Sequence, residues 1–105
     1  MGKIRIYTDE SVDIAIAEGL KRRGVDAFSA RDAGNLGLTD QEQLIFTHDT
    51  DFLRLASKCI EEKKTHYGVI YSYQKDYSIG ECIRRLKLLT TILTSEHMVN
   101  HIEFL

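Results

Sequence analysis

Residues 3–24, KIRIYTDESVDIAIAEGLKRRG, carry the pattern that decides the fold class. Lys3 to Thr8 alternates apolar and polar side chains and is rich in β-branched and aromatic residues, which predicts a strand. Ser11 or Asp13 can cap the helix that follows over Val12–Arg23, where the apolar positions form one face and a glycine provides the stop. A strand, a helix and a glycine in this order open a βαβ unit.

The rest of the chain continues to alternate between the two kinds of element. Further strands are predicted over 25–30, 44–47, 68–73 and 99–105, the last at an edge of the sheet. Further helices are predicted over 52–62 and 78–94, with a very short one near 39–42. Thr39 with Glu42, and Ser78 with Glu81, are possible capping boxes. The order predicts an α/β fold, with a mostly parallel central sheet and helices on both faces.

Composition limits the classes of protein to which the chain can belong. The 105 residues are 43% hydrophobic and 29% charged without a low-complexity tract, which is typical of a single domain over residues 1–105. The formal charge of −2 argues against nucleic-acid binding by bulk positive charge, although basic residues cluster locally. No stretch approaches the ~20 apolar residues of a membrane span, and the N-terminus turns acidic before a signal-peptide core. We therefore expect a cytoplasmic protein that makes no membrane contact.

The cysteines and histidines lack a clear metal-ligand spacing. Cys59 and Cys82 fall on apolar helical positions, so we predict buried thiols rather than a disulfide. His48, at the predicted end of a strand, could act as a base or ligand or be a partly exposed strand-end residue. The other histidines are scattered, and we predict surface or turn positions for His66, His97 and His101.

Carboxylates follow the predicted strands. Asp9 and Glu10 come after the first strand, Asp49 and Asp51 follow the third, and the short helix between them begins with Asp40 and Glu42. The carboxyl ends of parallel strands share one edge of a sheet, where ligands bind. Clustered acids repel one another unless a cation binds or one pKa rises. Oxygen ligands suit Mg²⁺ or Mn²⁺, ions that activate water in many nucleases and phosphatases.

A purely structural interpretation of the same acids stays open. Asp9, Asp49 and Asp51 could each cap a helix, and Glu42 is a capping-box residue. The two interpretations differ in whether the carboxylates converge.

Four short segments occur in a specific order: YTDE (7–10), RDAG (31–34), TDQEQL (39–44) and THDTDF (47–52). Their order and spacing resemble the signature of the small bacterial PIN-like proteins related to VapC toxins. The predicted strand after Gly68 and the helix after it extend the resemblance over most of the chain.

The resemblance implies a PIN-like three-layer fold and a metal-dependent endoribonuclease, the toxin of a pair whose small antitoxin protein wraps it. The acids that match the family's site, and would hold Mg²⁺ or Mn²⁺ and cleave RNA, are Asp9, Glu42, Asp49 and Asp51. Arg31 matches the family's loop arginine, which could orient a carboxylate or contact phosphate. Arg31 and His48 are thus candidate substrate contacts.

The chain departs from the family between Glu42 and Thr47, where about ten residues, the length of a short crossover helix, are missing. About fourteen residues then join the second and third strands, near the minimum for a parallel crossover, and leave part of the sheet without a covering helix. We therefore expect exposed apolar surface and a homodimer, which could exchange elements. The shortening also threatens the position of Glu42, so the alternative function is a degenerate PIN-like domain acting as an interaction or dimerisation module.

Overall fold

The computed structural model describes residues 4–29 and 44–105. In chain order its elements are β1 (Arg5–Thr8), α1 (Ile14–Arg22), β2 (Asp26–Ser29), β3 (Leu44–Thr47), α3 (Asp51–Glu61), β4 (Val69–Tyr71), α4 (Ile79–Ile92), α5 (Ser95–Met98) and β5 (Ile102–Phe104). Within these residues the predicted strands and helices are confirmed, whereas the short helix predicted near 39–42 lies outside them. The four-residue α5 was not predicted, and its turn shortens the expected last strand at its start.

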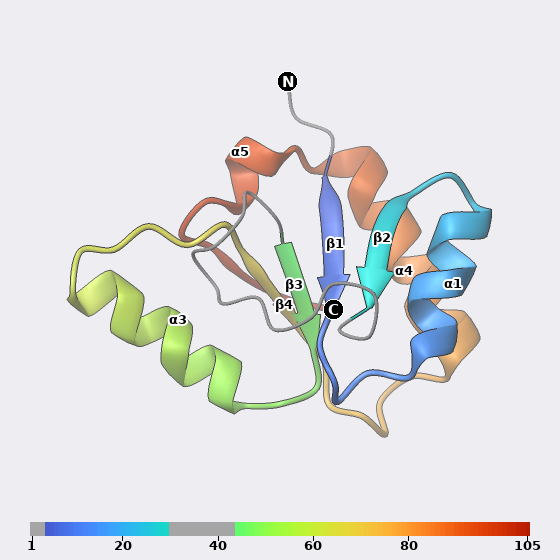
Figure 1. The fold of residues 1–105 in the computed structure, drawn as a ribbon, viewed down its shortest axis with the longest axis horizontal. Coiled ribbons are helices and arrows are strands. Elements are labelled where there is room, and N and C mark those ends of the chain that lie inside the picture. The colour runs from blue at the N-terminus through green and yellow to red at the C-terminus, as the bar shows by residue number, and fades with distance from the viewer. Residues whose placement is uncertain (1–3, 30–43) are drawn as a thin grey trace.

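The described strands form one parallel sheet in the order β2-β1-β3-β4-β5 (Figure 1). Thr8 at the end of β1 is in register with Phe46 of β3, and Thr47 at the end of β3 is in register with Tyr71 of β4. The carboxyl ends of these central strands therefore lie side by side. The prediction of a mostly parallel α/β sheet is confirmed.

Helices cover the two faces of the sheet unequally. α1 and α4 pack together on one face, whereas α3 covers the other (Figure 1). Successive residues of β3 pack on opposite faces of the sheet. Phe46 belongs to the larger core beneath α1 and α4, and Ile45 belongs to the smaller core beneath α3. Both side chains have no exposed surface. All four residues of β3 are buried, as expected for a central parallel strand.

The helix starts follow from their capping residues. Asp13 caps α1, because its carboxyl accepts a hydrogen bond from the Ala15 N–H at 2.9 Å, whereas Ser11 makes other contacts. Ser78 caps α4 by accepting from the Glu81 N–H at 3.1 Å. The expected capping box at this helix is only half present, since the Glu81 carboxylate is held by arginines one turn further on.

Two sequence predictions about single side chains need correction. His66, expected at the surface or in a turn, is completely buried. Two hydrogen bonds join the main chain of His66 to Asn100. The Asn100 side chain accepts from the His66 N–H at 3.0 Å, and the Asn100 N–H donates to the His66 carbonyl at 2.9 Å. Cys82 is buried as predicted, but Cys59 is only half-buried, and both are free thiols. Among the residues that the structure covers, no helix is long and apolar enough to cross a membrane.

Candidate functional site

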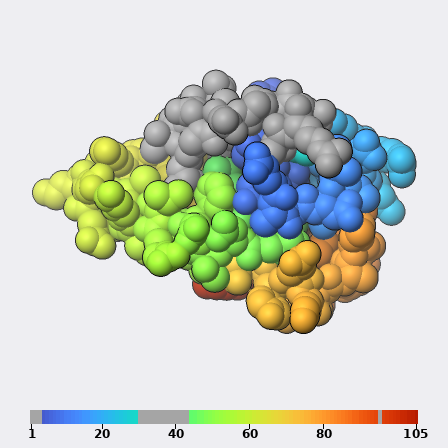
Figure 2. Space-filling view, turned by 60° about the horizontal axis from the view of Figure 1, so that its bottom comes forward, coloured from blue at the N-terminus to red at the C-terminus, as the bar shows by residue number. Residues whose placement is uncertain are grey.

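Two of the predicted acids stand at the carboxyl edge of the sheet. Asp9 directly follows β1, and Asp49 lies two residues beyond β3, the neighbouring strand. Figure 2 looks toward this edge and shows the segments after β1 (blue), β3 (green) and β4 (amber) meeting at the surface. The adjacent strand ends thus place both residues at one edge of the sheet, where the charge of Asp49 acts on the Asp9 carboxyl.

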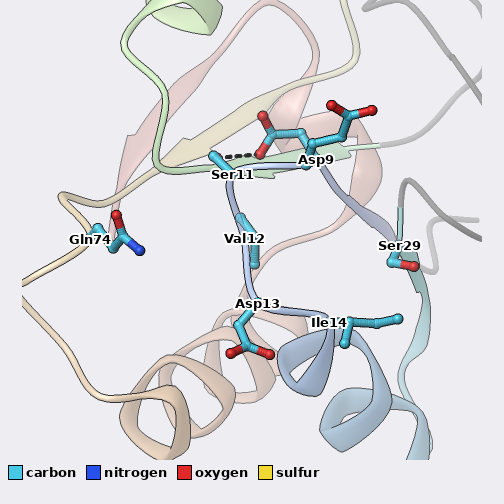
Figure 3. A pocket seen from close by; sticks show the side chains of 8 residues that line it. Asp9, Ser11, Val12, Asp13, Ile14, Ser29 and Gln74 are labelled. Atoms are coloured by element: carbon cyan, nitrogen blue, oxygen red, sulfur yellow. Dashed lines mark hydrogen bonds between the residues drawn. The ribbon is translucent and has the colours of Figure 1, made fainter.

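Ser11 joins the ends of β1 and β3. Its hydroxyl lies 2.6 Å from Oδ1 of Asp9 (Figure 3), accepts from the His48 N–H at 3.1 Å and lies 3.4 Å from the Thr47 hydroxyl. The Thr47 hydroxyl in turn accepts from the Asp49 N–H at 2.9 Å. A continuous set of hydrogen bonds therefore runs from the Asp9 carboxyl to the main chain of Asp49.

The environment of Asp9 works against its charge. Only 9% of the residue is exposed, and this burial raises the pKa of its carboxyl above the ordinary value. Hydrogen bonds from Ser11 and Thr47 oppose that rise in pKa, and the nearby charge of Asp49 adds to it. Asp9 is therefore a carboxyl that a cation would stabilise in its ionised form.

Asp49 and Asp51 have different surroundings, although they are two residues apart. Oδ1 of Asp49 accepts from the Asp51 N–H at 2.9 Å at the start of α3, so Asp49 also plays the capping part that was the structural alternative. The Asp51 side chain is 60% exposed and forms an ion pair with Arg54 of the same helix. Asp51 thus faces an arginine, whereas Asp49 is coupled electrostatically to Asp9.

His48 is held at the same edge in a defined orientation. Its Nδ1 lies 2.8 Å from the carbonyl oxygen of Ser72, just beyond β4, and its ring packs edge-on against Phe46 with centroids 5.3 Å apart. A carbonyl oxygen only accepts, so Nδ1 carries a proton, and in the neutral ring Nε2 is the acceptor. The half-buried His48 therefore links the end of β3 to the end of β4.

A pocket of about 600 Å³ opens beside Asp9 (Figure 3). It lies between the start of α1 and the chain that follows β4, from which Gln74 reaches its wall. The other residues lining it are Asp9, Glu10, Ser11, Val12, Asp13, Ile14 and Ser29. Three of the side chains named are carboxylates, and none is basic, so a polyanionic ligand would need a cation here.

The donor set suits a hard divalent ion. Asp9 and Asp49 offer carboxylate oxygens, and Mg²⁺ commonly binds one or two carboxylates and keeps several waters. Within residues 4–29 and 44–105, no group of three or more Asp, Glu, His or Cys side chains is placed to hold a metal. Asp40, Glu42 and Arg31, which were also predicted for the site or its surroundings, lie outside the described residues. The fit to Mg²⁺ or Mn²⁺ thus rests on two acids.

The roles of Ser11 and Thr47 were not predicted from the sequence. Ser11 was considered only as a helix cap, and Thr47 only as the end of a strand. The available signal was position: a small hydroxyl residue two places after Asp9 and another two places before Asp49, both at the ends of neighbouring strands. At such positions a hydroxyl can bridge between strands as well as cap a helix.

Comparisons with protein-family models, with curated proteins and with solved structures find no match to this chain.

Proposed function

We propose that this protein is a metal-dependent endoribonuclease of the PIN-like type, the toxin of a toxin–antitoxin pair. The observation that carries the proposal is the placement of Asp9 and Asp49 at the ends of adjacent parallel strands, joined through Ser11 and Thr47. The raised pKa of the buried Asp9 carboxyl supports it, because acids whose pKa is shifted by burial in a pocket are common at functional sites.

In this proposal Asp9 and Asp49 hold Mg²⁺ or Mn²⁺, and Glu42 completes the ligand set. The bound ion would supply Lewis acidity and a more acidic water for hydrolysis of an RNA phosphodiester. The protein's part is to orient the two carboxyl groups at a small polar pocket, where the cation would keep Asp9 ionised. Asp51, engaged by Arg54, has the smaller share in ion binding.

The first test is a calorimetric titration of the purified protein with Mn²⁺. Asp9→Asn and Asp49→Asn should each abolish saturable binding, because asparagine keeps an oxygen acceptor for the local hydrogen bonds but removes the charge. Asp26→Asn is the matched control, since Asp26 begins β2 and pairs with Arg5 at the opposite end of the sheet. Equal Mn²⁺ affinity in all four proteins would refute the metal site.

The second test is cleavage of single-stranded RNA with Mg²⁺ or Mn²⁺. We expect Asp9→Asn and Asp49→Asn to lower the rate by about 100-fold or more, the usual loss when a catalytic group is removed. Activity that persists in both variants, or that survives chelation of divalent ions, would exclude this function even if Mn²⁺ binds.

A specific observation favours the second candidate, a catalytically inactive interaction or dimerisation module. Large apolar side chains are exposed on α3, where Leu55 is 47% and Ile60 is 51% exposed, and Phe104 at the edge strand β5 is 65% exposed. Such side chains could be covered by an antitoxin or by a second copy of the chain. Sedimentation at micromolar concentration tests the homodimer: a monomer would remove the dimerisation module, and an absence of Mn²⁺ binding would remove the metal-dependent nuclease.

A further inference from the structure

The Ser11 hydroxyl has a defined hydrogen-bond direction toward Asp9 when that carboxyl is ionised. An ionised carboxyl can only accept, so the single Ser11 hydroxyl proton is donated to Asp9 at 2.6 Å. The two lone pairs of the same oxygen then face the His48 N–H at 3.1 Å and the Thr47 hydroxyl at 3.4 Å. The Thr47 hydroxyl also hydrogen-bonds the Asp9 carboxyl, so its single proton is shared between Asp9 and the longer contact to Ser11, and the firm partners of the Ser11 hydroxyl are Asp9 and the His48 N–H.

The neighbours of Ser11 belong to two strands that are far apart in sequence. Asp9 follows β1, whereas His48 and Thr47 belong to the end of β3. Thr47 passes the connection on, because its hydroxyl accepts from the Asp49 N–H at 2.9 Å. Rotation of the Ser11 side chain would therefore remove the 2.6 Å hydrogen bond to Asp9 together with the acceptor of the His48 N–H, and leave Asp9 to its remaining contacts with Thr47 and the Ser11 main chain.

We infer that Ser11 is the positioning residue of this site, whose hydroxyl fixes the orientation of the Asp9 carboxyl relative to the backbone that carries Asp49. The consequence for metal binding rests on the proposed function, but the consequence for the β1–β3 connection does not. Groups that orient metal ligands from behind typically change affinity by about 10–100-fold when they are removed. Ser11 fits this role because it touches a carboxyl oxygen without being an ionisable ligand itself.

The test compares Ser11→Ala, which removes the hydroxyl, with Ser11→Thr, which keeps it. Mn²⁺ titrations should give about 10–100-fold weaker binding for Ser11→Ala and affinity near that of the native protein for Ser11→Thr. Ser78→Ala is the matched control, because it also removes a serine hydroxyl that accepts a backbone N–H, but at the cap of α4. The control should lower thermal stability and leave Mn²⁺ affinity unchanged.

A second measurement needs no metal. Amide hydrogen exchange of His48, followed by NMR without divalent ions, should accelerate in Ser11→Ala and stay slow in Ser11→Thr and Ser78→Ala, because only the first loses the acceptor of the His48 N–H. If Ser11→Ala does not fold, Ser11→Cys, with a weakly hydrogen-bonding thiol of similar size, takes its place in both measurements.

Each outcome decides the role of Ser11. Faster His48 exchange with unchanged Mn²⁺ affinity would overturn the positioning role, and so would equal losses in the alanine and threonine variants. If the native protein binds no Mn²⁺, the proposed function fails, and the His48 amide alone then decides whether Ser11 joins the two strand ends.

Discussion

The two ends of the central sheet each bury a titratable side chain, but they surround it differently. At the carboxyl end, Asp9 is joined through Ser11 to Thr47 and His48. At the amino end, Nδ1 of His66 accepts from the Gly68 N–H at 3.1 Å, and its Nε2 finds no hydrogen-bond partner in the described parts of the chain. The Asp9 side chain therefore belongs to a connected network of hydrogen bonds, whereas within residues 4–29 and 44–105 the His66 side chain makes one hydrogen bond and is otherwise surrounded by packed atoms.

The difference shows how burial affects the charged form of each side chain. Burial raises the pKa of Asp9 and lowers the pKa of His66, so it disfavours the charged form of both. Near neutral pH, burial therefore favours the neutral form that His66 adopts, whereas an ionised Asp9 lowers the stability of the folded protein. Packing alone does not require such a carboxyl, and its position at a pocket agrees with the function proposed for that edge.

The largest expected loss of stability comes from a substitution at the amino end of the sheet, at Gly68. Gly68 has φ +114°, and a Cβ there would lie 2.8 Å from both Cβ and the carbonyl oxygen of Met98. Gly68→Ala should lower the free energy of unfolding by about 3 kcal/mol or more, because strain and overlap add together. Chemical denaturation measures this loss.

Gly24→Ala is the control for Gly68→Ala. Gly24 also has a positive φ, of 80°, but a Cβ there would have no atom within 4 Å. Only the backbone strain remains, so we expect a loss of about 1–2 kcal/mol. Equal losses at the two glycines would mean that the contact with Met98 contributes nothing.

Local signals predicted the elements of this fold well. The third strand was predicted with the bounds that the structure has, and Asp13 was one of two caps proposed for the first helix. These features depend on neighbours in sequence, on side-chain period and on capping chemistry. The same signals placed Asp9 and Asp49 at one edge, since a parallel sheet aligns its strand ends.

The errors and omissions concern contacts between distant residues. His66 follows two lysines and a threonine, so its local sequence indicates a surface, yet the turn at Asn100 fastens it inside. Ser11 has the chemistry of a helix cap, and only the packing of β1 against β3 brings it to His48 and Thr47. Such roles depend on contacts between residues that are distant in sequence, and the local periodicity of the sequence does not predict those contacts.

The next largest effect is a pH dependence of stability that originates at His66. The pKa of His66 is lower in the folded protein than its ordinary 6.5, so the unfolded chain takes up the proton first as the pH falls. Stability should therefore be lost as the pH falls below 6.5 and should level off below the folded pKa, with a slope of at most about 1.4 kcal/mol per pH unit.

Urea denaturation across this range tests the slope against His66→Asn, which keeps an acceptor for the Gly68 N–H but does not titrate. The variant should show a shallower slope. His97→Asn, at an exposed capping histidine whose Nδ1 accepts from the Thr94 N–H, should keep the native slope. A native slope in His66→Asn would assign the acid sensitivity to other groups.

The smallest effect has the opposite sign of pH dependence and belongs to Asp9. Because its folded pKa is raised above the ordinary 3.8, its ionised form destabilises the folded protein fully above the folded pKa and not at all below the unfolded one. In the presence of EDTA, Asp9→Asn should therefore raise the free energy of unfolding by about 0.5–2 kcal/mol near neutral pH, the size usual for a single stabilising substitution. The gain should vanish as the pH falls toward 3.8, where the native carboxyl is also neutral in the folded state. A variant that is less stable than the native protein near neutral pH would mean that the Ser11 and Thr47 hydrogen bonds outweigh burial, and the carboxyl would then be a structural residue like His66.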